Sequence, residues 1–210
     1  MFELNNIKFQ NVLDIPYLKI RQGKVTVITG PSGSGKSTLL KLLNKIQSPT
    51  GGEIYYKGEN IKNIDSVTLR RNLPMLGQDV IRYQKTVRDN LLIGLKFQNM
   101  NPVSDEILKD SLKKVRLEIS LDTKIEKLSG GEMQRVAISR LILLDKDTYL
   151  LDEPTSALDS KTEEIVIRNF IKNFKGKTII YVTHSERIAQ KYADDLIEIV
   201  GGKLIEPGSN

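Results

Sequence analysis

The stretch KVTVITGPSGSGKSTLLKLLNKI, residues 24–46, decides the fold of this chain. Its first part, KVTVIT, is rich in β-branched side chains and is bounded by glycines, which predicts a buried strand. A glycine-rich turn follows. The last part, STLLKLLNKI, is apolar almost all round, which predicts a helix buried inside the core. The stretch therefore predicts a strand, a glycine turn and a buried helix in succession.

The turn, GPSGSGKST, fits the pattern G-x-x-x-x-G-K-[ST] of a phosphate-binding loop. Its glycines let the backbone curl so that successive N–H groups point at an anion, and the helix start adds a partial positive charge. Lys36 supplies a cation for the β- and γ-phosphates, Ser37 a hydroxyl for Mg²⁺, and Thr38 a hydroxyl near the α-phosphate. The alternative, a flexible glycine loop, is disfavoured because the bare pattern is expected in roughly 1% of chains of this length. The expected nucleotide-binding residues are Gly30, Pro31, Ser32, Gly33, Ser34, Gly35, Lys36, Ser37 and Thr38.

A second motif, TYLLDEP at residues 148–154, supplies candidates for metal binding and for water activation. Asp152, at the end of an apolar strand, is expected to hold Mg²⁺, and Glu153 is expected to act as general base near the γ-phosphate. The alternative is that Asp152 caps a turn and Glu153 forms a salt bridge. The metal role is favoured because two acids at the end of an apolar strand have an electrostatic cost that a divalent cation offsets.

Between these motifs lies LSGGEMQR, residues 128–135, where two glycines follow a serine at the start of a predicted helix. In the structural interpretation, Ser129 caps that helix and the glycines let a loop turn. In the functional interpretation, bare N–H groups at the helix start hold an anion. A chain that already has one phosphate cradle would then need two nucleotides, or one nucleotide shared between two chains.

Apolar strands alternate with helical patterns along the rest of the chain, which predicts a mainly parallel sheet covered on both faces. The segment Val87–Lys127 has a different, helical character and is predicted to form a small lobe. It contains the helical pattern at 104–115, with Ser104 as N-cap. Strands are predicted at 2–9, 51–59, 73–76, 148–154 and 177–184, a helix at 160–174 and a closing hairpin at 195–206; Met133, Val136, Ala137, Leu141 and Leu144 share one helical face.

The composition is that of an ordinary globular chain. With 210 residues, 39% of them hydrophobic, we expect one domain with a sizeable core. The absence of cysteine excludes disulfides and thiolate metal sites. No apolar run approaches about 20 residues and the start is unlike a signal peptide, so we expect a cytosolic chain.

The formal net charge of +6 suits a nucleic acid partner, a membrane surface or a phosphate ligand. A lysine-rich solvated surface is favoured, because no aromatic-interleaved basic patch is visible. The tail 206–210 has only weak structural signals.

GPSGSGKST, LSGGE, LLDEP, SALD and the single histidine in VTH occur in the order and spacing of the ATP-binding cassette (ABC) ATPases, which this chain resembles over essentially its whole length. LSGG between a phosphate loop and an acidic strand is much more specific than the loop alone. The resemblance implies a P-loop NTPase fold, with a RecA-like, mainly parallel sheet flanked by helices and an N-terminal antiparallel β subdomain. It implies one nucleotide-binding domain over 1–210, with a small α-helical subdomain inserted at about 87–140.

The resemblance also explains the glycine pair. It implies that Ser129, Gly130 and Gly131 form a second anion-binding helix start, which contacts the γ-phosphate of ATP held by another copy. Two ATP molecules, each with Mg²⁺, are then expected between two copies that pair head to tail. Glu132 departs from the residue commonest in the family, which is glutamine, although many members have glutamate.

Further roles are implied position by position. Gln78, in MLGQD, matches the loop that senses Mg²⁺ and the attacking water; the alternative is a polar residue that ends a strand. His184 matches the switch histidine that touches the γ-phosphate. Asp159 matches the loop that crosses to the partner copy; the alternative is a helix N-cap. Phe9 is the expected adenine-stacking residue, with Tyr17 as a weaker rival and core packing as the alternative.

The resemblance implies a transporter subunit that works with a separate polytopic membrane permease, which docks on the helical lobe and on the segment after Gln78. We expect a cytoplasmic protein on the inner face of the cell membrane, with no nucleic acid partner. A non-transport ATPase acting on nucleic acid or ribosomes is the alternative, disfavoured because there is no long coiled coil and only one cassette. A nucleotide kinase leaves LSGGE unexplained.

The cargo is not encoded in recognisable residues. The stretches 28–54 and 128–135 are similar to small cassettes paired with metal-ion exporters, and also to general import and lipoprotein-release cassettes. Metal-ion export ranks slightly ahead, and the direction of transport stays open.

Overall fold

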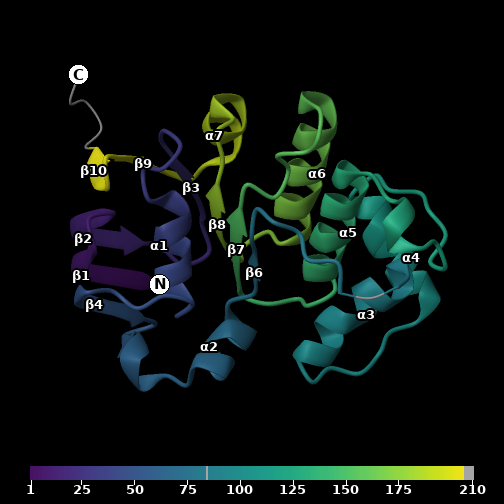
Figure 1. Cartoon of the computed structure of the whole chain (residues 1–210), viewed down its shortest axis with the longest axis horizontal. Helices are drawn as coiled ribbons and strands as arrows, with labels where there is room; N and C mark the ends of the chain where they lie inside the picture. Colours follow the sequence, from purple (N-terminus) through teal and green to yellow (C-terminus); the bar gives the residue numbers. More distant parts are fainter. Residues whose placement is uncertain (84, 206–210) are drawn as a thin grey trace. The chain divides into compact units, whose positions relative to one another are not determined.

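A computed structural model of the chain describes residues 1–83 and 85–205. The chain folds into two compact units, and Figure 1 labels the elements of both. The first unit comprises residues 1–75, 147–152 and the C-terminal part from Gly176. The second comprises 76–146 and 153–175. The weakly patterned tail, 206–210, lies outside the described residues.

An antiparallel sheet of four strands belongs to the first unit, in the order β2-β1-β4-β5. It confirms the expected N-terminal antiparallel subdomain. The sequence did not predict β2, which contains Pro16. Proline cannot donate a ladder hydrogen bond and is confined to edge strands, and β2 is an edge of this sheet. The strands are β1 (Phe2–Phe9), β2 (Leu13–Ile20), β4 (Gly51–Tyr56) and β5 (Glu59–Asn60).

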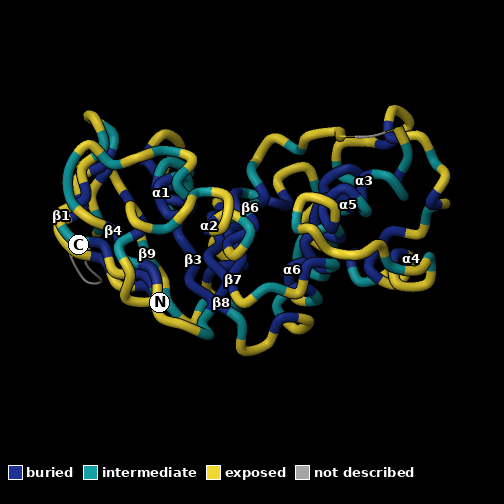
Figure 2. The backbone as a smooth tube through the Cα atoms, turned by 90° about the horizontal axis from the view of Figure 1, so that it is seen from below, coloured by how far each residue is buried: buried dark blue, intermediate teal, exposed yellow. Residues whose placement is uncertain are grey.

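A second sheet has the order β10-β9-β3-β8-β7-β6 and is mainly parallel, as predicted. β3 pairs in parallel with β8 and β9, β7 pairs in parallel with β8, and β10 closes the sheet antiparallel to β9. Every residue of β7 and β8 is buried, and Figure 2 shows both strands and β3 in dark blue. The strands are β3 (Val25–Thr29), β6 (Met75–Leu76), β7 (Thr148–Asp152), β8 (Thr178–Val182), β9 (Asp195–Val200) and β10 (Lys203–Ile205).

The strand predicted at 73–76 is wrong in its first half. Leu73 is the C-cap of helix α2 (Ser66–Asn72), and its N–H donates to the carbonyl oxygen of Leu69. Its backbone therefore belongs to the end of the helix and not to a strand. Pro74 has no N–H to donate to a ladder. Only β6 is left of the predicted strand.

The core of the first unit contains helix α1 (Lys36–Leu43), confirming the buried helix of the opening stretch. Its four leucines, at 39, 40, 42 and 43, are fully buried and belong to one apolar cluster with residues of both sheets. Figure 1 shows α1 beside β1 and β2. Burial of each leucine contributes about 2 kcal/mol. This cluster fixes α1, and therefore the turn that precedes it.

Helices form the second unit, and most of them were predicted. Met133, Val136 and Ala137 are buried on one face of α5, as expected, but Leu144, which is also buried, lies beyond the end of that helix. Ser104 occupies the N-cap position of α4, but its side chain accepts no capping hydrogen bond. The helices are α3 (Val87–Phe97), α4 (Asp105–Lys114), α5 (Gly130–Ile142) and α6 (Ser160–Asn173).

Three short helices were not predicted. Helix α2 and helix α7 (Glu186–Tyr192) have seven residues each, too few for a clear apolar period, and the 3₁₀ turn η1 (Ile61–Asn63) is shorter still. A further 3₁₀ turn, η2 (Ile125–Lys127), precedes α5. Within the described residues, no helix is long and apolar enough to cross a membrane.

Candidate functional site

Three glycines shape the predicted phosphate loop between β3 and α1. Gly30, Gly33 and Gly35 have φ angles of 136°, 76° and 102°, which L side chains rarely adopt. A Cβ at Gly30 would lie 2.0 Å from the carbonyl oxygen of Ile199, and one at Gly35 would lie 2.5 Å from Cδ2 of Leu13. A Cβ at Gly33 would meet open space. The loop is therefore held tightly at both ends and is open at its tip.

Lys36 begins α1 and reaches back across the loop. Its side chain is buried, and Nζ donates hydrogen bonds to the carbonyl oxygens of Gly30 (2.9 Å) and Pro31 (2.7 Å). The hydroxyl of Ser34 is also buried and has no hydrogen-bond partner within the described part of the chain. A buried polar group without a partner costs about 1–3 kcal/mol, which a hydrogen bond to a bound ligand would recover. The loop residues therefore fit a bound phosphate chain.

Ser37 and Asp152 come together, as the sequence predicted. The Ser37 hydroxyl donates to Oδ1 of Asp152 over 2.9 Å, and Asp152 is buried at the end of β7. No cluster of three or more His, Cys, Asp or Glu that could hold a metal occurs in the described residues. Mg²⁺ in nucleotide sites uses one or two carboxylates, waters and phosphate oxygens. The Ser37 and Asp152 oxygens therefore suit Mg²⁺ bound together with a phosphate.

His184 lies just after β8, and its residue is exposed. Together with Gly30 and Pro31 it lines a cleft of about 460 Å³, to which Thr183 and Glu198 also contribute. The parallel pairing of β3 with β8 explains this placement, because the carboxyl ends of parallel strands meet at one edge of a sheet. The predicted histidine thus shares a cleft with the first residues of the phosphate loop.

In the second unit, Gln78 and Glu153 contact each other. Nε2 of Gln78 donates to Oε2 of Glu153 over 3.5 Å, which is a long and weak hydrogen bond. Glu153 has a φ of 46°, in the left-handed region. This conformation costs roughly 1 kcal/mol in a residue other than glycine and is common at functional sites.

Ser129 is the N-cap of α5, as the structural interpretation of LSGG predicted. Its hydroxyl donates to Oε2 of Glu132 (2.7 Å), its N–H donates to the same oxygen (2.9 Å), and the Glu132 N–H donates back to the hydroxyl (3.3 Å). The backbone N–H of Ser129, and then its hydroxyl, hold the pKa of Glu132 below its ordinary value. The capping box therefore stabilises this carboxylate in its charged form.

The prediction that the two glycines let a loop turn is wrong. Gly130 and Gly131 are the first residues of α5, and neither has a positive φ. Gly131 relieves a tight approach instead, since a Cβ there would lie 3.0 Å from the carbonyl oxygen of Ala157 and 3.0 Å from Cδ2 of Leu158. The glycine lets the loop before α6 approach the helix start.

Gln134 was missed by the sequence analysis. It is buried on α5, accepts a hydrogen bond from the N–H of Ala157 (2.9 Å) and donates one to the Ser156 hydroxyl (2.9 Å). It thereby fastens the loop before α6 to the LSGG helix. The available signal was an uncharged polar residue next to Met133 on a face that is otherwise apolar.

Asp159 follows that loop and caps α6. Its carboxylate accepts the N–H groups of Lys161 (3.1 Å) and Thr162 (3.0 Å). Hydrogen bonds from the side chain and backbone of Thr162 lower the pKa of Asp159 from its ordinary value. The N-cap alternative therefore describes Asp159 in the single chain, and its contact with a partner copy stays a prediction.

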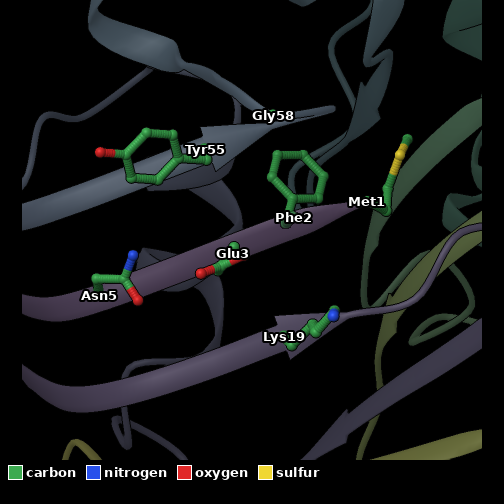
Figure 3. Close-up of a pocket in the computed structure, with 7 residues that line it drawn as sticks. All are labelled: Met1, Phe2, Glu3, Asn5, Lys19, Tyr55 and Gly58. Atoms are coloured by element: carbon green, nitrogen blue, oxygen red, sulfur yellow. The ribbon is translucent and has the colours of Figure 1, made fainter.

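The candidates for adenine stacking differ in exposure. Phe9 ends β1, is partly buried and packs against the core of the first unit, while Tyr17 on β2 is 52% exposed. A separate hollow of about 420 Å³ lies on the antiparallel sheet, where Glu3 pairs in register with Lys19 and Tyr55 (Figure 3). No predicted site residue lines that hollow, so we assign it no part in nucleotide binding.

The fold and the arrangement of these site residues define the class of protein. The chain belongs to the ABC transporter family, because the sequence model of that family matches residues 13–156. It is an ATP-hydrolysing cassette with the predicted P-loop fold, and cassettes of this class bind ATP or ADP.

Individual proteins and solved structures are similar to this chain over most of its length. The chain is 37% identical over 199 residues to ABC transporter I family member 17 of Arabidopsis thaliana, covering 92% of this chain and 73% of that protein. It is 37% identical over 216 residues to the mitochondrial iron-sulfur clusters transporter ABCB7 of Rattus norvegicus, covering 97% of this chain but 28% of that protein. The dimeric, post-hydrolysis structure of the ATP-binding cassette MJ0796 bound to ADP and Pi matches with a TM-score of 0.87 and 30% identity, covering 98% of this chain and 97% of that one.

Proposed function

We propose that this chain is the ATP-binding subunit of a membrane ABC transporter and works as a head-to-tail homodimer with two ATP molecules between the copies. The main support for this proposal is that one chain contains two helix N-termini suited to binding a phosphate. One is the glycine loop before α1, and the other is the Ser129 end of α5. The dimeric relative bound to ADP and Pi supports the pairing.

Each loop residue has a role in this proposal. Nζ of Lys36 exchanges two carbonyl partners for the β- and γ-phosphates, and the Ser34 hydroxyl gains an acceptor. Ser37 and Asp152 would hold Mg²⁺, which when bound neutralises phosphate charge. Phe9 is proposed to stack on the adenine.

The hydrolytic roles fall on three side chains. Glu153 accepts the proton of the attacking water, Gln78 positions that water, and His184 contacts the γ-phosphate. The hydrogen bond between Gln78 and Glu153 supports the first pair of roles, and the cleft that His184 shares with the phosphate loop supports the third. Asp159 is proposed to contact the partner copy from the N-terminus of α6.

The docking surface for a membrane permease is proposed on the second unit. Ile81, Tyr83, Phe97 and Met100 are between 38% and 58% exposed, and the Tyr83 and Phe97 rings meet edge to face at 5.5 Å. The Arg140 guanidinium stacks over the Tyr83 ring in a cation–π contact, with its central carbon 4.8 Å from the ring centre. Exposed apolar groups gathered in this way are typical of protein interaction sites.

A groove of about 500 Å³ along α3 extends the apolar surface. Ile93, Lys96 and Met100 are among its lining residues. We propose that a helix of a separate polytopic membrane subunit occupies it, which would place this cassette in the cytoplasm at the inner face of the membrane. We propose metal ions as the transported substrate and export as the direction of transport. Co-purification of the chain with a polytopic membrane protein from detergent extracts tests this part of the proposal, and recovery from cytosol alone contradicts it.

The pairing is tested with Glu153→Gln, which keeps the shape of the base but removes its charge. We expect this variant to bind ATP without turning it over and to elute as a dimer in size-exclusion chromatography. Without nucleotide it should elute as a monomer of 23.7 kDa. A variant that stays monomeric at high protein concentration with saturating ATP contradicts the proposed function.

A further inference from the structure

The donors at the Ser129 helix start are already engaged in the single chain. Both the hydroxyl and the backbone N–H of Ser129 donate to one oxygen of Glu132, over 2.7 and 2.9 Å. Glu132 is half-buried, and the Ser129 hydrogen bonds hold its pKa below the ordinary value, which favours the charged form. An acidic side chain therefore already engages the Ser129 donors that the proposed function assigns to a phosphate oxygen.

A serine hydroxyl has a single hydrogen to donate. While that hydrogen is bound to the Glu132 carboxylate, it cannot also be donated to a terminal phosphate. The carboxylate and the phosphate are both anions, so they repel each other in addition to competing for the donor. Hydrogen bonds to a charged acceptor are roughly twice as strong as those to a neutral one. Displacing Glu132 is therefore costlier than displacing a neutral side chain.

We propose that Glu132 is a built-in competitor of the shared phosphate: its carboxylate holds the Ser129 hydroxyl in the single cassette and must release it before a γ-phosphate on a second copy can bind. Glu132 thereby sets the strength of ATP-driven pairing. The inference rests on the proposed function, because it assumes that Ser129 receives a phosphate from the partner copy.

The chain contains a matched control for this inference. Helix α3 begins with the same arrangement, in which the Thr86 hydroxyl donates to Oδ2 of Asp89 over 2.6 Å and the Thr86 N–H donates to it over 3.2 Å. No phosphate role is proposed for that helix start. Neutralising Asp89 therefore reports the cost of weakening a capping box without any effect on a shared nucleotide.

The experiment compares Glu132→Gln with Asp89→Asn, each made together with Glu153→Gln so that ATP is not consumed. Glutamine retains the capping geometry, because its amide oxygen still accepts the Ser129 N–H. Sedimentation at a series of protein concentrations with saturating ATP gives the dimer dissociation constant. Fluorescent-ATP binding to the single chain and the unfolding temperature are measured in parallel.

We expect Glu132→Gln to lower the dimer dissociation constant at least about tenfold at low salt. The substitution removes one negative charge that repels the phosphate at each of two equivalent sites. The difference should shrink as salt is raised. ATP binding by the single chain should not change, and the unfolding temperature should shift no more than in Asp89→Asn. Glu132→Ala, which removes the acceptor altogether, should strengthen pairing as well.

Two failures are distinguishable. If the Glu153→Gln background dimerises with ATP but Glu132→Gln and Asp89→Asn leave the dissociation constant equally unchanged, the inference is wrong and the proposed function stands. If no variant dimerises at any concentration, the head-to-tail pairing is wrong and the inference falls with it.

Discussion

Glu153 shows how one residue can be identified by sequence and yet have an unforeseen conformation. Its position after an apolar strand predicted a general base, but not its left-handed backbone with a φ of 46°. That region disfavours every residue with a Cβ, so local preference argues against it. The conformation persists because the surrounding structure holds it, and residue-level patterns carry no information about such restraint.

The cost of this conformation can be measured by comparing Glu153→Gly with Glu153→Gln. Both variants lack the carboxylate and should lose ATP turnover. Glycine adopts positive φ without strain, so we expect Glu153→Gly to be more stable than Glu153→Gln by about 1 kcal/mol in urea unfolding.

A control at Glu164, inside helix α6, should give the opposite sign. There, glycine is expected to be less stable than glutamine by about 1 kcal/mol, because it weakens a helix interior. Equal stability of the two Glu153 variants would mean that the left-handed backbone is not strained.

At the scale of elements, sequence patterns were sufficient where an element is mostly apolar and buried. Strands β3, β7 and β8 and helix α1 have continuous apolar signals and were predicted. Strand β2 was missed because Pro16 conceals an edge strand, and α7 because seven residues give no clear period. The capping box of α5 had a signal, a serine three residues before a glutamate, but only half of it was used.

Contacts between helices were beyond prediction, and Gly94 is an example. It lies on α3, and a Cβ there would come within 2.5 Å of Cγ of Arg140 on α5. Burial lowers the pKa of the Arg140 guanidinium, and two of its nitrogen atoms, Nε and Nη2, have no hydrogen-bond partner within the described residues. The arginine stem is therefore confined between α3 and the Tyr83 ring.

We expect Gly94→Ala to destabilise the protein by about 1–3 kcal/mol, since the arginine stem must shift to admit the methyl group. In an Arg140→Ala background the same change should become stabilising by about 1 kcal/mol, because alanine is the better helix former. Urea unfolding of the four proteins forms a double-mutant cycle.

Gly77→Ala is the control for this cycle, because a Cβ at Gly77 meets no atom within 4 Å and the residue has ordinary φ. It should be neutral in both backgrounds. If Gly94→Ala costs as much with Arg140 as without it, the contact between the two helices does not explain the glycine.

At the scale of the whole molecule, the motifs identified the candidate residues but not their state in the single chain. The structure places the phosphate loop, Asp152 and His184 in its first unit, and Gln78, Glu153 and Ser129 in its second. Sequence spacing could not reveal that the Lys36 ammonium is bound to loop carbonyls. Nor could it reveal that the Ser129 donors are bound to Glu132. Both depend on which acceptors the folded chain brings within reach.

The central claim, that two copies complete each other's nucleotide site, is tested most directly by mixing two inactive variants. Lys36→Ala lacks the phosphate-loop cation and Ser129→Ala lacks the donor hydroxyl, so neither should turn over ATP alone. In a mixed pair one composite site has both defects, while the other combines an intact loop with an intact Ser129. Random pairing makes about half of the dimers mixed, each with one complete site of two, so ATPase activity should recover to about a quarter of the wild-type rate. A mixture as inactive as its separate components, under conditions where the wild-type protein hydrolyses ATP, would contradict the account.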